Sequence, residues 1–284
     1  MDLFQALVLG LIQGLTEFLP ISSSAHLTFV PWLFGWDDRA INSLLFDVAL
    51  HMGTLLAVVT YFARDWQRLV MAGLRSVWER RIGDDSDRRL VWLLALGSLP
   101  AAVVGLVAED GVESMFHDPA HARTGLTVIA IMMIVMGLLL LLAERIGSRR
   151  LELKDIGIAA TLAIGLAQAL ALIPGVSRSG STITAGLFLG LKRDAAARFS
   201  FLLSTPTVLG AGLLKVVDVI QAGGIPAQQQ MGFFMGFFAA AVSGFATIHF
   251  LLRYLQQRTT APFIWYRLFV GAGLMLLLLL GFRS

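Results

Sequence analysis

The chain has 284 residues, of which 57% are hydrophobic and only 14% are charged, whereas about 25% of the residues in a typical soluble domain are charged. Its net charge is +3, its mean hydropathy is +0.77, and it contains no cysteine. This composition excludes a disordered chain, a coiled coil, a collagen, an ordinary cytosolic enzyme and any disulfide or zinc–thiolate framework. Most of the apolar surface must face lipid, so residues 1–284 are predicted to form a single membrane domain.

The first apolar segment, Leu3–Phe34, is interrupted near its middle by Pro20 and a run of three serines. The residues before it lack the basic region of a signal peptide, and we expect no cleaved leader here. Neither half reaches the roughly 20 residues that a helix needs to cross a bilayer. Non-helical backbone at membrane depth must be buried in protein or line a wet cavity, so the segment is predicted to be a re-entrant helical hairpin.

Six further apolar runs have the length and low charge of membrane-spanning helices. In chain order they are Ser43–Phe62, Leu90–Ala108, Thr124–Ala143, Phe199–Val217, Met231–Leu252 and Pro262–Phe282. After the first of them, apolar residues between Trp66 and Trp78 recur at helical spacing among arginines, which predicts an amphipathic helix on the cytoplasmic leaflet. After the third, Ile156–Leu191 is interrupted by Pro174 and a serine cluster, so a second re-entrant hairpin is predicted.

The basic residues orient this arrangement in the membrane. Sixteen of the 22 lie in four loops, at Arg64–Arg89, Arg145–Lys154, Lys192–Arg198 and Arg253–Arg258. The positive-inside rule places these loops in the cytoplasm. That assignment requires both interrupted segments to enter and leave on one side, with the first hairpin opening outward and the second inward.

An internal repeat agrees with this topology. The pattern G-L-x-Q-x-L begins at Gly10 and again at Gly165, and each copy is followed by proline and a serine-rich turn. The predicted fold is therefore an all-α integral membrane protein with six transmembrane helices and two re-entrant hairpins in an inverted-topology repeat, with halves of about 1–145 and 155–284.

One helix of the second half carries a stripe of small residues that allows close helix packing. The stripe consists of Gly232, Gly236, Ala240 and Gly244. It can serve packing within the chain or between subunits, which leaves a homodimer open.

Polar groups within a membrane are costly and are functional candidates by default, and here they concentrate at the two breaks. They are Gln13, Glu17, Ser22, Ser23, Ser24 and His26 in the first break, and Ser177, Arg178, Ser179, Ser181 and Thr182 in the second. A new helix starting after each proline would direct free N–H groups into the turn. Hydroxyls, an arginine, a carboxylate and an imidazole then form an oxyanion site able to hydrolyse an anionic ester or anhydride.

Simpler interpretations exist for each residue alone. The serines can be helix caps, His26 can be a satisfied polar residue at a helix start, and Arg178 can form a structural ion pair with Glu17. Their joint occurrence at two repeat-related turns favours a functional site. Broken helices at the midplane are also a transporter architecture, so a transporter or flippase for a lipid-linked or other anion is the alternative function.

Residues 13–26, QGLTEFLPISSSAH, and 174–182, PGVSRSGST, resemble the two signatures of bacterial undecaprenyl-diphosphate phosphatases of the bacitracin-resistance type. The resemblance covers essentially the whole chain. It implies a multi-pass enzyme of the bacterial inner membrane that converts undecaprenyl diphosphate to the monophosphate and so recycles the lipid carrier for cell-wall polymers. It further implies a site facing the periplasm, with a polyprenyl diphosphate and membrane lipids as partners and no nucleic acid.

By position, the resemblance implies Glu17, Ser23, His26 and Arg178 as catalytic residues, with Gln13 at a place where the family has Glu or Gln. The expected substrate-binding residues are Gln13, Ser22, Ser24, Ser177, Ser179 and Thr182. Ser23, His26 and a water activated through Glu17 and His26 are three candidate nucleophiles.

Two departures from the usual family pattern bear on this carry-over. Ser24-Ala25 stands where threonine–glycine is common, which should leave the turn intact, and Gln13 removes one carboxylate. A divalent cation, Mg²⁺ or Ca²⁺, is implied by the resemblance and suits a diphosphate. Gln13 weakens a two-carboxylate metal site. The ligands of the cation are expected to come mostly from substrate and water.

Overall fold

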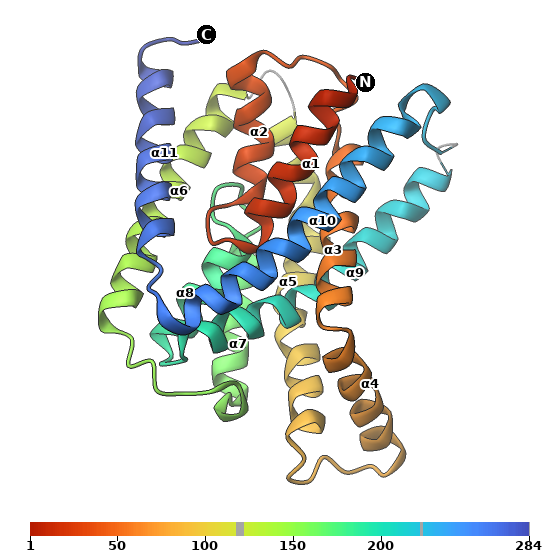
Figure 1. The fold of residues 1–284 in the computed structure, drawn as a ribbon, viewed down its shortest axis with the longest axis vertical. Helices are drawn as coiled ribbons and strands as arrows, with labels where there is room; N and C mark the ends of the chain where they lie inside the picture. Colours follow the sequence, from red (N-terminus) through yellow and green to blue (C-terminus); the bar gives the residue numbers. More distant parts are fainter. Residues whose placement is uncertain (118–121, 222–223, 284) are drawn as a thin grey trace.

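The computed structural model describes residues 1–117, 122–221 and 224–283. Eleven α-helices and one short 3₁₀ helix account for most of the described residues (Figure 1). They are α1 (Leu3–Phe18), α2 (Ser23–Phe34), α3 (Leu44–Tyr61), α4 (Ala63–Trp78), α5 (Ser86–His117), α6 (Ala122–Ile146), η2 (Leu153–Asp155), α7 (Ile158–Leu170), α8 (Arg178–Phe188), α9 (Arg193–Gln221), α10 (Ala227–Gln257) and α11 (Ala261–Leu279).

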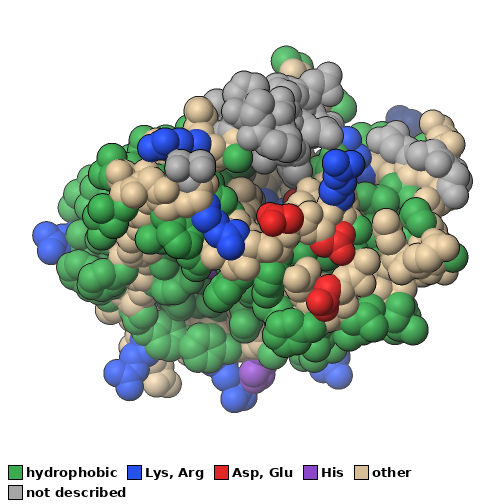
Figure 2. Space-filling view, turned by 90° about the horizontal axis from the view of Figure 1, so that it is seen from above, with side chains coloured by type: hydrophobic (Ala, Val, Ile, Leu, Met, Phe, Trp, Pro, Cys, Tyr) green, Lys and Arg blue, Asp and Glu red, His purple; other side chains and the backbone are tan. Residues whose placement is uncertain are grey.

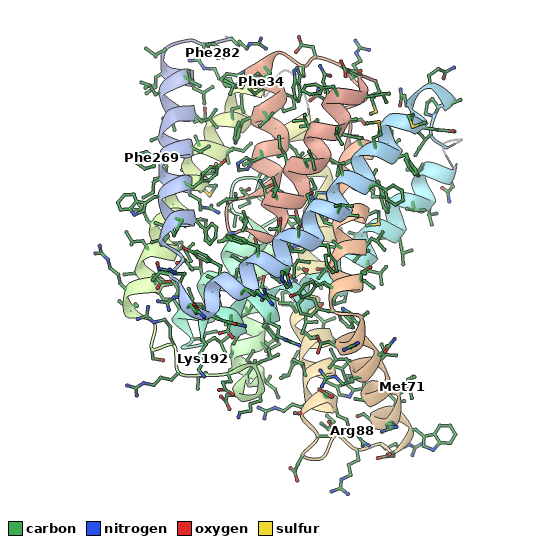
Figure 3. All side chains as sticks on the ribbon, in the orientation of Figure 1. Phe34, Met71, Arg88, Lys192, Phe269 and Phe282 are labelled. Atoms are coloured by element: carbon green, nitrogen blue, oxygen red, sulfur yellow. The ribbon has the colours of Figure 1, made fainter. Side chains whose placement is uncertain are left out.

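The six predicted membrane spans are confirmed as long apolar helices. Among the described residues, α3, α5, α6, α9, α10 and α11 have the length and hydropathy to cross a bilayer. Their outer faces carry apolar side chains such as Phe269, which is 73% exposed and points away from the bundle in Figure 3. Figure 2, a view onto the end that holds both termini, likewise shows hydrophobic side chains along the edge. The chain is an all-α, multi-pass membrane protein.

The two interrupted segments form helical hairpins, α1–α2 and α7–α8, that open toward opposite ends of the molecule (Figure 1). The four basic loops all lie at the end where α7–α8 opens (Figure 1). Figure 3 labels Arg88 and Lys192 of these loops at that end, and Phe34 and Phe282 at the other end. Insertion of the hairpins into a bilayer as re-entrant elements, and the division into inverted repeats, stay predictions.

The glycines of the repeated G-L-x-Q-x-L pattern let each hairpin approach another helix closely. A Cβ added to Gly10 of α1 would lie 2.4 Å from the carbonyl oxygen of Gly236 in α10. A Cβ added to Gly165 of α7 would lie 2.3 Å from the carbonyl oxygen of Gly97 in α5. Both distances are shorter than any real contact, so the first helix of each hairpin needs glycine at this position.

The small-residue stripe of α10 is used for packing within the chain. Besides facing Gly10, Gly236 lies against Phe46 and Leu50 of α3, and Gly244 lies against Phe18 of α1. The stripe therefore gives no support to a homodimer, which stays an untested prediction.

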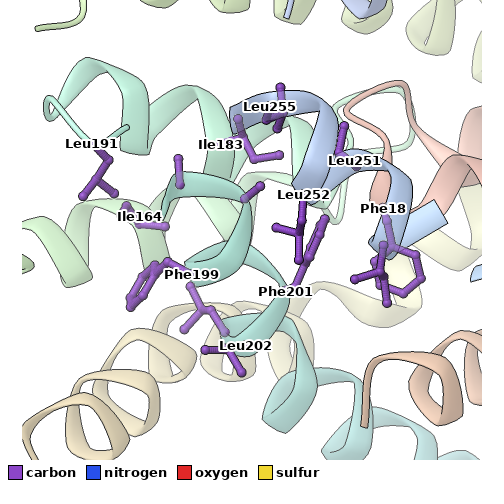
Figure 4. Packing of buried hydrophobic residues seen from close by; sticks show 14 of the residues in the cluster. Phe18, Ile164, Ile183, Leu191, Phe199, Phe201, Leu202, Leu251, Leu252 and Leu255 are labelled. Atoms are coloured by element: carbon purple, nitrogen blue, oxygen red, sulfur yellow. The ribbon is translucent and has the colours of Figure 1, made fainter. Parts of the chain in front are cut away.

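The largest buried apolar cluster of the described residues lies where α1 and α8 meet α9 and α10 (Figure 4). Phe18 at the end of α1 packs edge-on against Phe201 of α9, with ring centroids 5.2 Å apart. Ile183 of α8, Phe199 of α9 and Leu251 of α10 complete the centre of this cluster and are fully buried. The cluster fixes α1 and α8 relative to the spanning helices α9 and α10.

The amphipathic segment is helical, as predicted, but it packs against a neighbouring helix. Leu69 of α4 is 1% exposed, and Trp92 Nε1 of α5 donates a hydrogen bond to Ser76 Oγ of α4 at 3.0 Å. The α4–α5 hairpin projects beyond the bundle (Figure 1), and Met71 points outward from it (Figure 3). The predicted placement of α4 on the membrane surface is untested.

The close approach of α7 and α5 predicts a stability effect. Gly165→Ala should lower the unfolding temperature in detergent, because overpacking against a backbone atom costs about 1–3 kcal/mol. Gly273→Ala in α11 is the matched control, since a Cβ there meets nothing within 4 Å. It should leave the unfolding temperature equal or slightly higher. Equal unfolding temperatures for the two variants would contradict the packing argument.

Candidate active site

The two breaks fold into turns of the same geometry. Ser22 and Ser177 are the N-cap residues of α2 and α8, and both have left-handed backbone conformations, with φ of 75° and 74°. The Ser22 hydroxyl accepts a hydrogen bond from the amide of Ala25 at 3.4 Å, and the Ser177 hydroxyl accepts one from Gly180 at 3.0 Å. A non-glycine residue in this region costs about 1–3 kcal/mol, and such strain is concentrated at functional sites.

The tips of the two hairpins are in direct contact. Ser179 Oγ at the start of α8 donates a hydrogen bond to the carbonyl oxygen of Leu19 in the first turn at 2.9 Å. The positive ends of α2 and α8 are thereby brought together, although the two turns are far apart in the sequence. Two helix N-termini at one place form a setting suited to an anion.

Glu17, the last but one residue of α1, connects the predicted residues of both turns. One carboxylate oxygen, Oε1, pairs with the guanidinium of Arg178, the first residue of α8. The other, Oε2, accepts hydrogen bonds from Ser23 Oγ at 2.5 Å and from Gln13 Nε2 at 3.1 Å. The Glu17 side chain is 4% exposed and that of Arg178 is 21% exposed.

This cluster has the arrangement of a nucleophile, a base and an anion clamp. The Ser23 hydroxyl is already hydrogen-bonded to a carboxylate that can accept its proton. Arg178 is partly accessible and carries donors suited to phosphate. The side chains around Arg178 are of mixed character, with apolar Phe18 and Val58 beside polar Thr54 and Ser204.

The structure gives the His26 imidazole partners other than Glu17. Its Nδ1 lies 2.6 Å from the carbonyl oxygen of Ser22, which requires a proton on Nδ1. Its Nε2 therefore accepts the hydrogen bond from the Tyr266 hydroxyl of α11 at 2.6 Å. Because both ring nitrogens are engaged, this imidazole holds the first turn against α11 in the ligand-free chain.

The remaining predicted binding residues line the turns in matching ways. Ser22 and Ser24 pair through their hydroxyls at 3.3 Å, and Ser177 and Ser179 do the same at 3.3 Å. Thr182 is buried one turn farther along α8, where its hydroxyl contacts the carbonyl of Arg178 and Ser200 Oγ. These contacts support the start of α8, and none of them is with the Glu17 carboxylate.

Three residues outside the two signatures also reach the site. His51 Nε2 of α3 lies 3.7 Å from Glu17 Oε2, and its side chain is 34% exposed. Tyr266 contacts His26, and Arg267 contacts both turns. The location of His51 within an apolar span was a signal for it, and Arg267 is likewise a charged residue within an apolar span, whereas Tyr266 has no such signal.

The donor set of the site does not fit a metal held by protein ligands. Among the described residues, no group of three His, Asp or Glu side chains could hold a metal ion. Glu17 is the carboxylate of the cluster, and its oxygens are already engaged by Arg178, Ser23 and Gln13. The side chains of the cluster therefore do not form a resident metal site.

Comparisons with known proteins agree on one family. The family model for the bacitracin resistance protein BacA matches residues 6–273. A protein of Thermomicrobium roseum named undecaprenyl-diphosphatase is 49% identical over 99% of this chain and 99% of its own length. Proteins of the same name from Pelotomaculum thermopropionicum and Alcanivorax borkumensis are 47% and 48% identical, each over at least 97% of both chains. The chain belongs to the BacA family of bacitracin resistance proteins.

Proposed function

We propose that the protein hydrolyses undecaprenyl diphosphate to undecaprenyl phosphate and inorganic phosphate, which recycles the lipid carrier for cell-wall polymers and confers resistance to bacitracin. The observation that carries the proposal is the contact of one buried carboxylate, Glu17, with both the Ser23 hydroxyl and the Arg178 guanidinium, between two helix N-termini. The printed name of the relatives is that of an enzyme for this reaction.

In the proposed complex, the diphosphate binds where the two turns meet. Arg178 exchanges its pairing with Glu17 for the phosphoryl oxygens, to which the guanidinium can donate two parallel hydrogen bonds. The amides at the starts of α2 and α8 add donors. The polyprenyl chain then lies between helices or in lipid.

Release from Arg178 frees Glu17 to act as the general base. Glu17 takes the proton of Ser23, the Ser23 oxygen forms a bond to the terminal phosphorus, and the bond from that phosphorus to the bridging oxygen breaks. Undecaprenyl phosphate leaves with the bridging oxygen. Water then attacks the phosphorus of the phosphoserine, and the bond from that phosphorus to the Ser23 oxygen breaks. Glu17 returns its proton to the Ser23 oxygen, and inorganic phosphate departs with the oxygen and protons of the water. The 2.5 Å hydrogen bond from Ser23 to Glu17 favours this route over attack by His26, whose nitrogens are both engaged.

The proposed membrane orientation puts the basic end of the molecule in the cytoplasm. The basic loops and the open end of α7–α8 lie at that end, and the open end of α1–α2 lies at the other. The positive-inside rule supports this orientation. The resemblance to bacterial enzymes of the bacitracin-resistance type supports an inner-membrane location with the site reached from the periplasm. The exposed apolar faces of the spanning helices would then contact membrane lipids.

The first test is phosphate release from a polyprenyl diphosphate by the purified protein in detergent. Detergent solution has no compartments, so turnover there separates an enzyme from a transporter. We expect steady release by the wild type. Absence of release with Mg²⁺, Ca²⁺ and other divalent ions would overturn the proposal, and flux of lipid-linked anions in sealed vesicles would then be measured.

We further propose that a divalent cation, Mg²⁺ or Ca²⁺, enters with the diphosphate and takes its ligands mostly from substrate and water. EDTA should therefore abolish phosphate release, and an excess of either ion over the chelator should restore it. The unfolding temperature without substrate should not change on chelation, because the chain holds no resident ion in this proposal. Full activity in excess EDTA would contradict it.

A further inference from the structure

Arg267 of α11 is the largest fully buried side chain among the described residues, with 0% exposure. Its guanidinium donates hydrogen bonds to five backbone carbonyl oxygens at distances between 2.7 and 3.3 Å. These belong to Pro20, Met132, Met133, Gly175 and Val176. Neither family signature contains Arg267, and all three of its side-chain nitrogens are engaged by these carbonyls.

These carbonyls come from three separate parts of the chain. Nη1 donates to Pro20 in the first turn at 3.1 Å. Nη2 donates to the carbonyl oxygens of Gly175 and Val176 in the second turn at 2.7 and 3.2 Å. In α6, Nη2 also donates to the carbonyl oxygen of Met132, and Nε donates to that of Met133. The rigid, planar guanidinium of Arg267 therefore bridges the two turns that carry the proposed site.

Arg267 also lies against the start of α8. A Cβ added to Gly180 would be 3.1 Å from Nη1, so the glycine there leaves room for the guanidinium. No carboxylate among the described residues lies within 4.0 Å of Arg267. Burying such a charge costs several kcal/mol per ion unless dipoles compensate it, and here the carbonyls of the turns supply that compensation.

Packing of α11 on α6 does not by itself require this arginine. At the other end of the same helix pair, Arg123 Nη2 donates to the carbonyl oxygen of Leu278 at 3.1 Å. Between the two arginines, Gly271 allows α11 to approach the Ala130 carbonyl, with a Cβ there at 3.0 Å. The contacts that are particular to Arg267 are those with Pro20, Gly175 and Val176.

We infer that Arg267 is a positioning residue for the proposed hydrolysis, holding the two turns at the separation at which Arg178 and the starts of α2 and α8 reach the same diphosphate. This inference rests on the proposed function. A lysine at this position keeps the charge but has a single nitrogen, so it lacks the fork of separated nitrogens that reaches these carbonyls of both turns. Loss of the fork should shift the turns, weaken diphosphate binding and lower the rate together.

The test compares Arg267→Lys and Arg267→Met with Arg123→Lys and Arg123→Met, which change an exposed arginine of the same helix pair that also donates to a backbone carbonyl. For each variant, kcat and KM for a polyprenyl diphosphate are measured in detergent alongside the unfolding temperature. We expect Arg267→Lys to lower kcat/KM by about 30-fold or more, with KM raised at least about threefold, and Arg267→Met to lower it further. Both controls should stay within about twofold of the wild type.

The KM separates positioning from a purely structural role. A variant that only reduced the amount of folded protein would lower the apparent kcat at unchanged KM. A folded Arg267→Lys protein with wild-type kcat and KM, or with a loss confined to kcat and matched by the folded fraction, would overturn the inference. If Arg267→Met does not fold, the lysine variant decides. Absence of phosphate release by the wild type would instead overturn the proposed function.

Discussion

Glu17→Gln should lower kcat for phosphate release by roughly 1,000-fold, within the range of about 10²–10⁴ for loss of a general base. The amide keeps the volume of the side chain and can still accept a hydrogen bond from Ser23, but it cannot take up the proton. It also removes the negative charge that faces Arg178 in the ligand-free chain. Binding of the diphosphate should therefore be retained or tightened, so the loss should appear in kcat rather than in KM.

Glu144 provides a matched control for this substitution. Its side chain is also buried, pairs with an arginine from another helix, Arg193, and accepts a hydrogen bond from Thr260 Oγ1 at 2.7 Å. It belongs to the last turn of α6, apart from the two hairpin turns. Glu144→Gln should lower the unfolding temperature and leave the activity per folded molecule nearly unchanged. Equal kinetic losses in Glu17→Gln and Glu144→Gln would show that a buried ion pair, and not a base, had been removed.

The sequence predicted the spans and the two interruptions because both follow from local composition. In lipid, a run of about 20 apolar residues forms a helix, because the helix satisfies the backbone N–H and C=O groups within the segment. Pro20 and Pro174, with the serines after them, interrupt such runs. The pairing of Glu17 with Arg178 is expected on similar grounds, since charges in a membrane need partners. In the structure this pair lies at the contact between the hairpin tips, where it can serve a structural or a functional role.

The contacts of Arg267 and His26 could not be predicted in the same way. The partners of Arg267 are backbone carbonyls, which every residue has, so no side-chain pattern indicates them. The contact of His26 with Tyr266 joins residues 240 positions apart, and it depends on how α11 packs beside α2. The sequence alone does not distinguish the candidate nucleophiles, because the direction of the imidazole is set by tertiary packing.

Arg178→Lys should lower kcat/KM for the polyprenyl diphosphate by roughly 100-fold, with most of the loss in affinity and in stabilisation of the transferred phosphoryl group. The ammonium keeps the charge and can still pair with Glu17, so the ligand-free fold is preserved. It lacks the planar fork that donates two parallel hydrogen bonds to phosphoryl oxygens. Arg193→Lys is the control, because Arg193 pairs with Glu144 in the same manner away from the turns.

The opposing hypothesis, a structural ion pair between the hairpins, makes a different prediction for the double variant Glu17→Gln/Arg178→Met. Replacing both members of a buried pair by neutral groups is often neutral for stability, so a pair with a purely structural role would leave a folded and active protein. If the pair belongs to the site, the double variant should be as stable as the wild type within a few degrees and should release no phosphate above background. An unfolding scan and a phosphate assay on one preparation decide between the two hypotheses. Only a functional pair predicts a double variant that is stable but inactive.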